Sequence, residues 1–113
     1  MGNLKILLTG ATGFLGKEFV KYLQDDYEIT VLVRNSSDIS LLKKYNCEII
    51  KFNEYSEINK IFENNDFSGV VHFASSVIVE HKSNDIEGLI SSNIIFGTYL
   101  LEACKQTKVN WFI

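Results

Sequence analysis

The stretch LLTGATGFLG, residues 7–16, joins an apolar run to an amphipathic segment through three glycines. Gly10 permits a sharp turn out of a strand, Gly13 lets the backbone approach a pyrophosphate, and Gly16 lets the following helix pack tightly. The helix N-terminus adds free N–H groups and the positive end of its dipole. Such glycines also occur in purely structural turns, but the flanking strand and helix favour dinucleotide binding. The predicted cofactor contacts in this turn are Gly10, Thr12, Gly13, Phe14, Leu15 and Gly16.

Short apolar runs alternate with helix-period segments along the chain. The predicted strands, each nearly continuous in hydrophobicity, are residues 5–9, 28–33, 48–52, 69–73 and 110–113. The predicted helices are residues 13–24, 37–45, 55–64 and 85–105. Strands without polar alternation are covered on both faces, which is typical of a parallel sheet. The pattern predicts one α/β domain over residues 1–113 with a doubly wound parallel sheet. Analogy with known dinucleotide-binding folds gives the strand order 3-2-1-4-5, with ligands at the carboxyl ends of the first and fourth strands.

The composition is that of an ordinary globular chain. Its 113 residues are 46% hydrophobic with a net charge of −3 and no basic stripe, which excludes a disordered chain and argues against a nucleic-acid partner. No apolar run reaches membrane-spanning length, and residues 1–5 lead directly into the first strand, so we expect a cytoplasmic protein without a signal peptide or membrane partner. Cys47 and Cys104 lack metal-binding spacing, and we expect reduced thiols rather than a disulfide, with no metal site.

Four stretches occur in the order in which they occur in a known family. They are TGATGFLG at 9–16, VLVRN at 31–35, VVHFASS at 70–76 and SNIIFGTYLLEACK at 92–105. With these motifs the chain resembles the extended short-chain dehydrogenase/reductase family, which includes nucleotide-sugar epimerases and dehydratases. The resemblance covers the whole chain. It implies NADP or NAD as the cofactor and a nucleotide-activated sugar as the substrate of the complete enzyme.

The catalytic pair of that family is absent from this sequence. Family members use Tyr-x-x-x-Lys, in which the tyrosine is the acid/base, whereas none of the five tyrosines here is followed by lysine at that spacing. The chain ends on Trp111, Phe112 and Ile113 in the last predicted strand, where the sheet would be left half covered. We therefore expect the N-terminal, cofactor-binding part of a larger enzyme, without a catalytic residue in this part and inactive by itself.

Arg34 ends the second predicted strand, where this fold meets the adenosine ribose. An acidic residue there would accept hydrogen bonds from the 2′-hydroxyl and repel a 2′-phosphate, whereas arginine attracts the phosphate. Arg34 therefore favours NADP over NAD, with Asn35 and Ser36 as further donors. The alternative interpretation is a solvated arginine at a strand end.

Further candidate contacts follow the third and fourth predicted strands. At Asn53 the family commonly has an aspartate beside the adenine, although Asn53 and Glu54 are equally suited to begin a turn before the next helix. Phe73, Ala74 and Ser75 follow the fourth strand, where small residues let the backbone pass close to the cofactor. We count all three among the cofactor contacts.

We expect His72 and most of the long predicted helix to support the fold. His72 points away from Phe73 in an extended strand, which favours a packed histidine over a general base. The family's equivalent of Asn93 bonds main chain near the active site, and we include Asn93 among the cofactor contacts. The periodicity of this helix predicts a buried stripe of Leu89, Ile90, Leu100, Leu101 and Cys104. Related enzymes dimerise through this helix, and the apolar residues predicted to be free for self-association are Ile94, Ile95, Phe96 and Tyr99.

Three functional hypotheses follow. The leading one is the cofactor-binding portion of a reductase, epimerase or dehydratase that acts on a nucleotide-activated sugar and assembles as a homo-oligomer. The alternative is a non-catalytic NADP-binding or redox-sensing module that regulates a partner through the exposed sheet edge. Flavin or isoflavone-type reduction by the atypical branch of the superfamily ranks lower, because that branch usually lacks a VVHFAS-like stretch.

Overall fold

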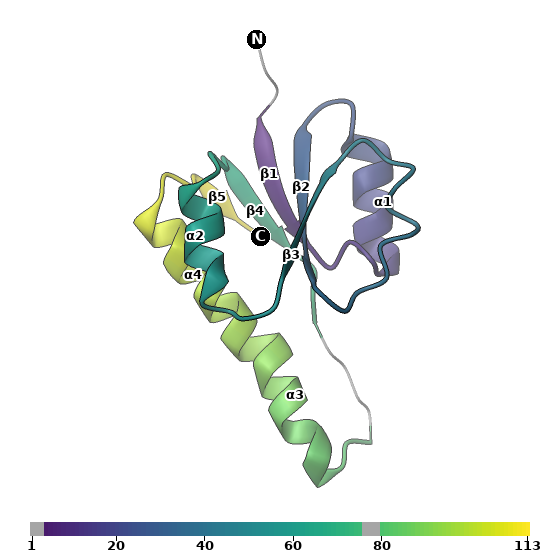
Figure 1. Ribbon diagram of the computed structural model, residues 1–113, viewed down its shortest axis with the longest axis vertical. Coiled ribbons are helices and arrows are strands. Elements are labelled where there is room, and N and C mark those ends of the chain that lie inside the picture. The colour runs from purple at the N-terminus through teal and green to yellow at the C-terminus, as the bar shows by residue number, and fades with distance from the viewer. Residues whose placement is uncertain (1–3, 76–79) are drawn as a thin grey trace.

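The computed structural model describes residues 4–75 and 80–113 as one parallel sheet flanked by helices (Figure 1). The strand order is β3-β2-β1-β4-β5. The strands are β1 (Lys5–Thr9), β2 (Glu28–Arg34), β3 (Glu48–Phe52), β4 (Gly69–His72) and β5 (Trp111–Phe112). The predicted α/β class, parallel sheet and strand order are confirmed.

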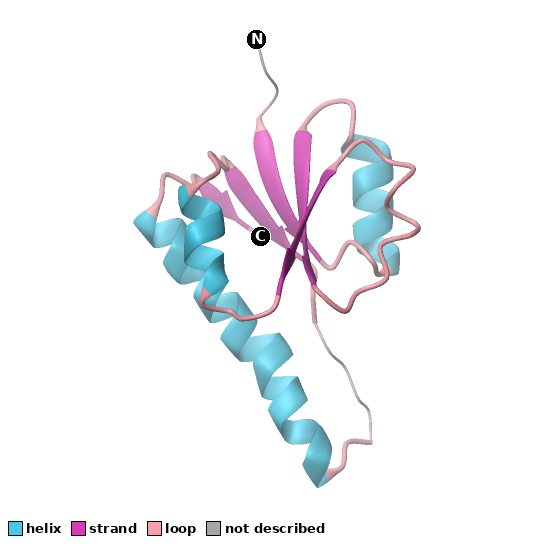
Figure 2. Ribbon diagram, viewed as in Figure 1, coloured by secondary structure: helices cyan, strands magenta, loops and turns pink. Residues whose placement is uncertain are grey.

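Helices cover both faces of the sheet (Figure 2). Helix α1 (Phe14–Leu23) lies on one face, and α2 (Glu57–Glu63) and α4 (Phe96–Gln106) lie on the other. A short 3-10 turn, η1 (Ser83–Asp85), leads into α3 (Ile86–Ile90), and the π-helical turn η2 (Ser91–Ile95) joins α3 to α4 without a break. We call residues 86–106 the long helix. Within the part of the chain that the structure describes, no helix is long and apolar enough to cross a membrane.

Two apolar cores form because neighbouring residues of each strand point to opposite faces of the sheet. Leu7, Leu32 and Val70 are buried beneath α2 and α4. Ile6 and Leu8 are buried on the opposite face, which α1 covers. Burying one such side chain contributes about 1.5–3 kcal/mol. These continuous apolar strands are therefore explained by burial on both faces.

The strand register brings the carboxyl ends of four strands to one edge of the sheet. Thr9 at the end of β1 pairs with Leu32 of β2 and with His72 of β4. Arg34 at the end of β2 pairs with Phe52 at the end of β3. Residues that follow these strands therefore meet at one place, as the sequence predicted for the ligand site.

The helix predicted over residues 37–45 is wrong. The Asp38 carboxylate accepts a hydrogen bond from the Ser40 N–H at 3.0 Å, which lowers the pKa of Asp38. Such a local side-chain bond offers the backbone an alternative to the helix. A turn then brings Ile39 and Leu42 against the core on the α1 face, with a Leu42 N–H to Ile39 carbonyl bond of 3.0 Å. The segment therefore packs as consecutive turns.

The buried stripe of the long helix differs from the predicted one. Phe96, Leu100 and Ala103 are its buried residues in α4, whereas Leu101 is 52% exposed and Ile90 is 43% exposed. Phe96, which was predicted to be free for self-association, belongs to the core. Leu100 is buried as predicted, and Cys104 packs against the same core.

Gly16 is where α1 packs against the glycine turn, and a side chain there is expected to destabilise the fold. A Cβ atom on Gly16 would overlap the Gly10 carbonyl group and the Ala11 Cα atom, which are backbone and cannot swing aside. We expect Gly16→Ala to lower the free energy of unfolding by about 1–3 kcal/mol, the usual cost of overpacking. Urea unfolding followed by circular dichroism measures the change.

Gly88→Ala is the matched control for this prediction. Nothing lies within 4 Å of a Cβ atom built on Gly88 in α3. We expect this variant to be more stable than the wild type by about 0.5–1 kcal/mol, because alanine favours the helix over glycine. Wild-type stability in Gly16→Ala would contradict the close packing of α1.

Candidate functional site

The glycine turn between β1 and α1 holds the backbone in a shape that other residues do not allow. Gly10 has a φ of +76°, and a Cβ atom there would lie 2.6 Å from the Ala74 nitrogen. The Gly13 N–H donates to the Gly10 carbonyl at 3.1 Å. Gly13 then caps α1 without a side-chain hydrogen bond, and the first N–H groups of a helix have no partner within the helix itself. The turn therefore presents backbone donors at the carboxyl end of β1.

A cavity of about 370 Å³ opens beside this turn. Its walls come from the glycine turn, the ends of β2 and β4, the loop before α2 and the long helix. The described residues that line it are Gly10, Thr12, Gly13, Arg34, Tyr55, Phe73, Ala74, Ser75, Ser92 and Phe96. Arg34 is the only charged residue among them. A positive side chain and a helix N-terminus together favour an anionic ligand.

The structure brings half of the predicted cofactor contacts together in this cavity. Those that line it are Gly10, Thr12, Gly13, Arg34, Phe73, Ala74 and Ser75. Phe14, Leu15 and Gly16 form the first turn of α1 at its edge, with the Phe14 and Leu15 side chains exposed. Asn35, Ser36, Asn53 and Asn93 are not among the lining residues, and their cofactor contacts stay predictions. Ser76, from the VVHFASS stretch, lies outside the described residues.

Asn53 takes part in the turn that leads into α2. The Glu57 carboxylate accepts hydrogen bonds from the Asn53 N–H at 2.6 Å and the Glu54 N–H at 2.9 Å. Both bonds lower the pKa of Glu57, and the bond from the Glu54 N–H has the larger effect. Asn93 lies elsewhere, in a shallow pocket that His72 also lines. The turn that the sequence offered as an alternative for Asn53 is therefore present.

Arg34 is held by aromatic groups at the end of β2. Its guanidinium carbon lies 4.6 Å from the centroid of the Tyr55 ring and 5.3 Å from that of Phe52. Its Nη2 group donates a hydrogen bond to the Tyr55 hydroxyl. A guanidinium over an aromatic face is stabilised by the charge distribution of the ring. Arg34 therefore differs from the freely solvated arginine of the alternative interpretation.

The sequence interpretation missed three residues of the cavity, Tyr55, Ser92 and Phe96. Tyr55 follows β3, and its place after a strand that ends at the ligand edge was a usable signal. Ser92 lies in the π-helical turn and Phe96 follows it directly. No local sequence pattern indicates that turn. Helical periodicity alone therefore could not predict that these two side chains line the cavity.

His72 is a packed histidine, as the sequence predicted. Its Nδ1 atom lies 2.6 Å from the Thr9 hydroxyl oxygen, which also accepts a hydrogen bond from the Ala74 N–H at 3.2 Å. The imidazole packs edge to face against Phe96, with 5.2 Å between the ring centroids. Burial lowers the pKa of His72, because the imidazolium form loses its hydration. The ring therefore links β1, β4 and the long helix as a neutral group.

The pKa of His72 predicts a specific pH dependence of stability. The folded chain resists protonation of His72, whereas the unfolded chain takes up the proton near the usual pKa of 6.5. The unfolded state then binds more protons, so stability falls as the pH falls. We expect the free energy of unfolding to decrease from about pH 7 to about pH 5. We also expect His72→Gln to show a shallower decrease in urea unfolding across this range.

His81→Gln is the control, because His81 is exposed in the loop before η1. We expect it to keep the wild-type slope of unfolding free energy against pH. A wild-type slope in His72→Gln would show that another group causes the dependence.

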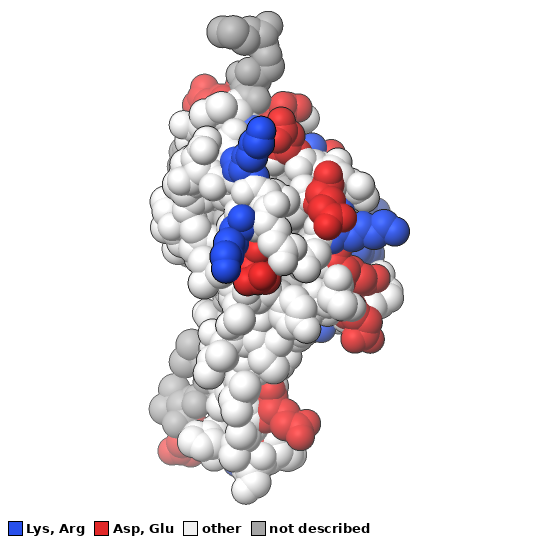
Figure 3. All heavy atoms as spheres, turned by 90° about the vertical axis from the view of Figure 1, so that its left-hand side faces the viewer, with Lys and Arg blue, Asp and Glu red and all other residues white. Residues whose placement is uncertain are grey.

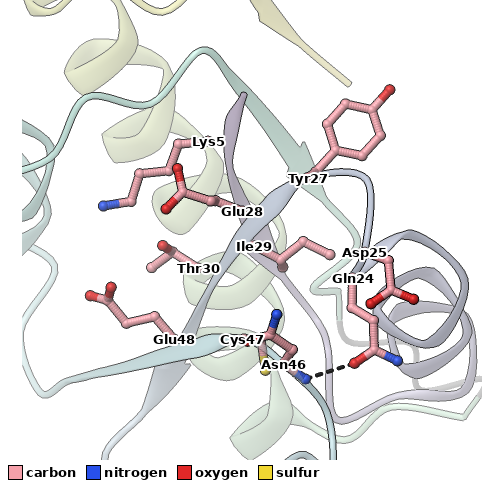
Figure 4. Close-up of a pocket in the computed structure, with 10 residues that line it drawn as sticks. All are labelled: Lys5, Gln24, Asp25, Tyr27, Glu28, Ile29, Thr30, Asn46, Cys47 and Glu48. Atoms are coloured by element: carbon pink, nitrogen blue, oxygen red, sulfur yellow. Dashed lines mark hydrogen bonds between the residues drawn. The ribbon is translucent and has the colours of Figure 1, made fainter. Parts of the chain in front are cut away.

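A second hollow of about 320 Å³ lies at the opposite, amino-terminal ends of the strands (Figure 4). Glu28 and Glu48 come to it from β2 and β3, and the Asn46 N–H donates to the Gln24 side-chain oxygen at 2.7 Å. Three carboxylates, those of Asp25, Glu28 and Glu48, outnumber the single Lys5 ammonium group here and oppose the binding of phosphates, and no glycine is among the described residues that line this hollow. The cavity at the carboxyl ends is therefore better suited to an anionic ligand than this hollow.

The two cysteines are free thiols, as the sequence predicted. Cys47 and Cys104 are both half-buried, and burial raises the pKa of each thiol. In the described ranges 4–75 and 80–113, His, Cys, Asp and Glu side chains form no group of three that could hold a metal ion.

The parallel sheet with its glycine turn between β1 and α1 defines a Rossmann-like α/β domain. A sequence profile of the NAD dependent epimerase/dehydratase family matches residues 6–113. The chain belongs to this family.

Curated relatives resemble the chain along most of its length. It is 32% identical over 114 residues to dTDP-glucose 4,6-dehydratase of Salmonella typhimurium, in a match that covers 91% of this chain and 31% of that protein. It is 28% identical over 120 residues to dTDP-D-glucose 4,6-dehydratase of Dictyostelium discoideum, covering 96% of this chain and 28% of that protein. The chain thus spans about a third of the length of these two relatives.

A solved structure with the same fold is the UDP-Glc/GlcNAc 4-epimerase of Campylobacter jejuni. The TM-score is 0.86 at 26% identity, and the match covers 97% of this chain and 36% of that one. The fold of residues 4–75 and 80–113 is therefore that of the corresponding third of a nucleotide-sugar epimerase.

Proposed function

We propose that this chain is the dinucleotide-binding portion of a nucleotide-sugar epimerase or dehydratase, with NADP favoured over NAD. The observation that carries the proposal is the cavity that the glycine turn and Arg34 share. The family and the sugar-nucleotide enzymes among the relatives support the substrate class. The bound cofactor would supply hydride transfer to and from the sugar.

The residues of the cavity divide the work of binding between them. The glycine turn and the first N–H groups of α1 hold the pyrophosphate, because a helix N-terminus attracts anions. Gly13 leaves room for this, since its own Cβ position has only the Gly10 carbonyl oxygen nearby, at 3.4 Å. Phe73, Ala74 and Ser75 border the cavity at the end of β4. They orient the nicotinamide half of the cofactor toward the substrate.

The preference for NADP rests on the charge of the cavity. Arg34 meets the adenosine ribose at the end of β2, and no acidic residue is among the described lining residues to repel a 2′-phosphate. A guanidinium forms strong, charge-assisted hydrogen bonds to phosphate. Asn35 and Ser36, in the exposed turn after β2, are further donors within the same proposal.

The complete enzyme is proposed to carry its catalytic residues outside these 113 residues, because no Tyr-x-x-x-Lys pair is present. The fragment by itself is then expected to bind cofactor without turning over substrate. The two free thiols support the expected cytoplasmic location, because that compartment keeps cysteines reduced.

A second copy of the chain is the proposed partner of the long helix. Ile86, Ile90, Ile94 and Leu101 are exposed along it. Figure 3 shows few charged side chains over the projecting part of the molecule, where α3 lies. Exposed apolar patches of this kind mark interaction surfaces, which supports the expected homo-oligomer.

Gly13→Val tests the cofactor site. The fold has space at the Gly13 Cβ position, so we expect stability to change little, while the branched side chain enters the space proposed for the pyrophosphate. We expect the dissociation constants for NADP and NAD to rise by more than about tenfold, equivalent to about 1.4 kcal/mol. Isothermal titration calorimetry measures both constants.

Gly88→Val is the control for Gly13→Val, because the Gly88 Cβ position is open and Gly88 is not among the residues that line the cavity. We expect it to bind both dinucleotides as the wild type does. Unchanged affinity in Gly13→Val would refute the assignment of the glycine turn to the pyrophosphate.

Arg34→Gln tests the choice of cofactor. Loss of the charge removes a charge-assisted hydrogen bond, so we expect NADP binding to weaken by about 1.5–3 kcal/mol, with little change for NAD. Calorimetry with each cofactor measures the difference. Lys44→Gln is the control, because Lys44 lies over the Tyr45 ring and is absent from the lining of the cavity. Equal losses for both cofactors in Arg34→Gln would indicate a structural arginine.

A further inference from the structure

The hydroxyl group of Tyr55 uses its whole hydrogen-bonding capacity. It accepts a hydrogen bond from Arg34 Nη2 and donates one to the Ser91 carbonyl at 3.1 Å. Its oxygen also lies 2.7 Å from the Ser91 hydroxyl. The Ser91 carbonyl can only accept and takes the single phenol proton, so the Ser91 hydroxyl is the donor in this last bond. Tyr55 thus connects Arg34 to the long helix.

The Tyr55 ring is packed among other aromatic rings. It stacks on Tyr99 with 5.7 Å between centroids and 20° between planes. It also contacts Phe96 at 5.6 Å and Phe52 at 5.8 Å. Arg34 lies over the same ring at 4.6 Å. The guanidinium therefore rests on a support that is packed on the sheet and on the long helix.

The π-helical turn supplies the acceptor for this arrangement. Ser91 begins η2, and π-helical turns interrupt the regular helix pattern, often at functional sites. Ser91 offers both its carbonyl oxygen and its hydroxyl to Tyr55. The irregularity of the helix and the position of Arg34 are thus joined through one side chain.

We propose that Tyr55 is a positioning residue, which holds Arg34 toward the adenosine ribose and so determines how strongly the site prefers a cofactor with a 2′-phosphate. This inference rests on the proposed function of the cavity. An arginine side chain loses much rotamer freedom on binding, and a group ordered in advance loses less. Arg34 has five N–H donors. The one given to Tyr55 fixes the plane of the guanidinium, and its remaining donors serve the ligand.

The test compares NADP with NAD in a variant that keeps the aromatic ring. Tyr55→Phe removes only the hydroxyl, so the ring contacts of Tyr55 are retained. We expect the dissociation constant for NADP to rise about five- to tenfold, the effect of losing one hydrogen bond of ordinary strength. We expect the constant for NAD to change by less than about twofold, because the hydroxyl acts through Arg34 on the 2′-phosphate. Calorimetry on this chain measures both constants.

Two further variants separate positioning from support of the fold. Ser91→Ala keeps the carbonyl but loses the hydroxyl, and we expect a change of the same sign, about two- to threefold for NADP. In Arg34→Gln, adding Tyr55→Phe is expected to cause no further loss of NADP affinity, because Tyr55 acts through Arg34. Tyr22→Phe removes a hydroxyl from an exposed tyrosine of α1. We expect it to leave both constants unchanged.

The outcomes distinguish this inference from the function on which it rests. A wild-type chain that binds neither dinucleotide overturns the proposed function and this inference with it. Wild-type binding that Gly13→Val abolishes supports the function, and an unchanged ratio of NADP to NAD affinity in Tyr55→Phe then overturns the role of Tyr55 alone. Equal losses for both cofactors in Tyr55→Phe also overturn it, because they indicate only support of the fold.

Discussion

The close approach of two backbone segments, the turn at Gly10 and the end of β4 at Ala74, determines the rest of the structure. A Cβ atom on Gly10 would lie 2.6 Å from the Ala74 nitrogen. The Thr9 hydroxyl, beside this contact, binds both the Ala74 N–H and the ring of His72. Because β1 and β4 meet here, α1 starts at a fixed place, and the cavity lies where the two strands end. The position of the side chains in the site therefore depends on this backbone contact.

The features predicted correctly from the sequence depend on signals within short stretches. The glycine turn follows from Gly10, whose positive φ few other residues adopt. The parallel sheet follows from continuous apolar strands separated by crossovers, whereas its strand order came from analogy with known dinucleotide-binding folds. Arg34 was placed by its position at the end of β2, and the structure locates it in the cavity. His72 was interpreted from the alternation of side chains along a strand, and its packing on Phe96 agrees.

The errors arose where tertiary contacts or backbone irregularities override periodicity. Residues 37–45 carry helix-like spacing, yet the Asp38 side chain binds the local backbone, and the segment forms turns. In the long helix, Leu100 of the predicted stripe is buried and Cys104 packs on the same core, whereas Ile90 and Leu101 are exposed and Phe96 is buried in their place. The place of Tyr55 after β3 was a usable signal for the cavity, but its bond to Ser91 joins residues that are distant in the sequence. No window of local sequence contains that pairing.

The aromatic support of Arg34 has a consequence for how ligands reach the protein. In the described part of the chain its contacts are with Tyr55 and Phe52, which are uncharged. Among the described residues, therefore, no carboxylate cancels the guanidinium charge, and none of them forms an ion pair that an arriving anion would have to break. On a chain whose net charge is −3, this leaves a local positive field at the cavity. Such a field steers anions only within about 8 Å at physiological salt, so nucleotide capture should slow as ionic strength rises.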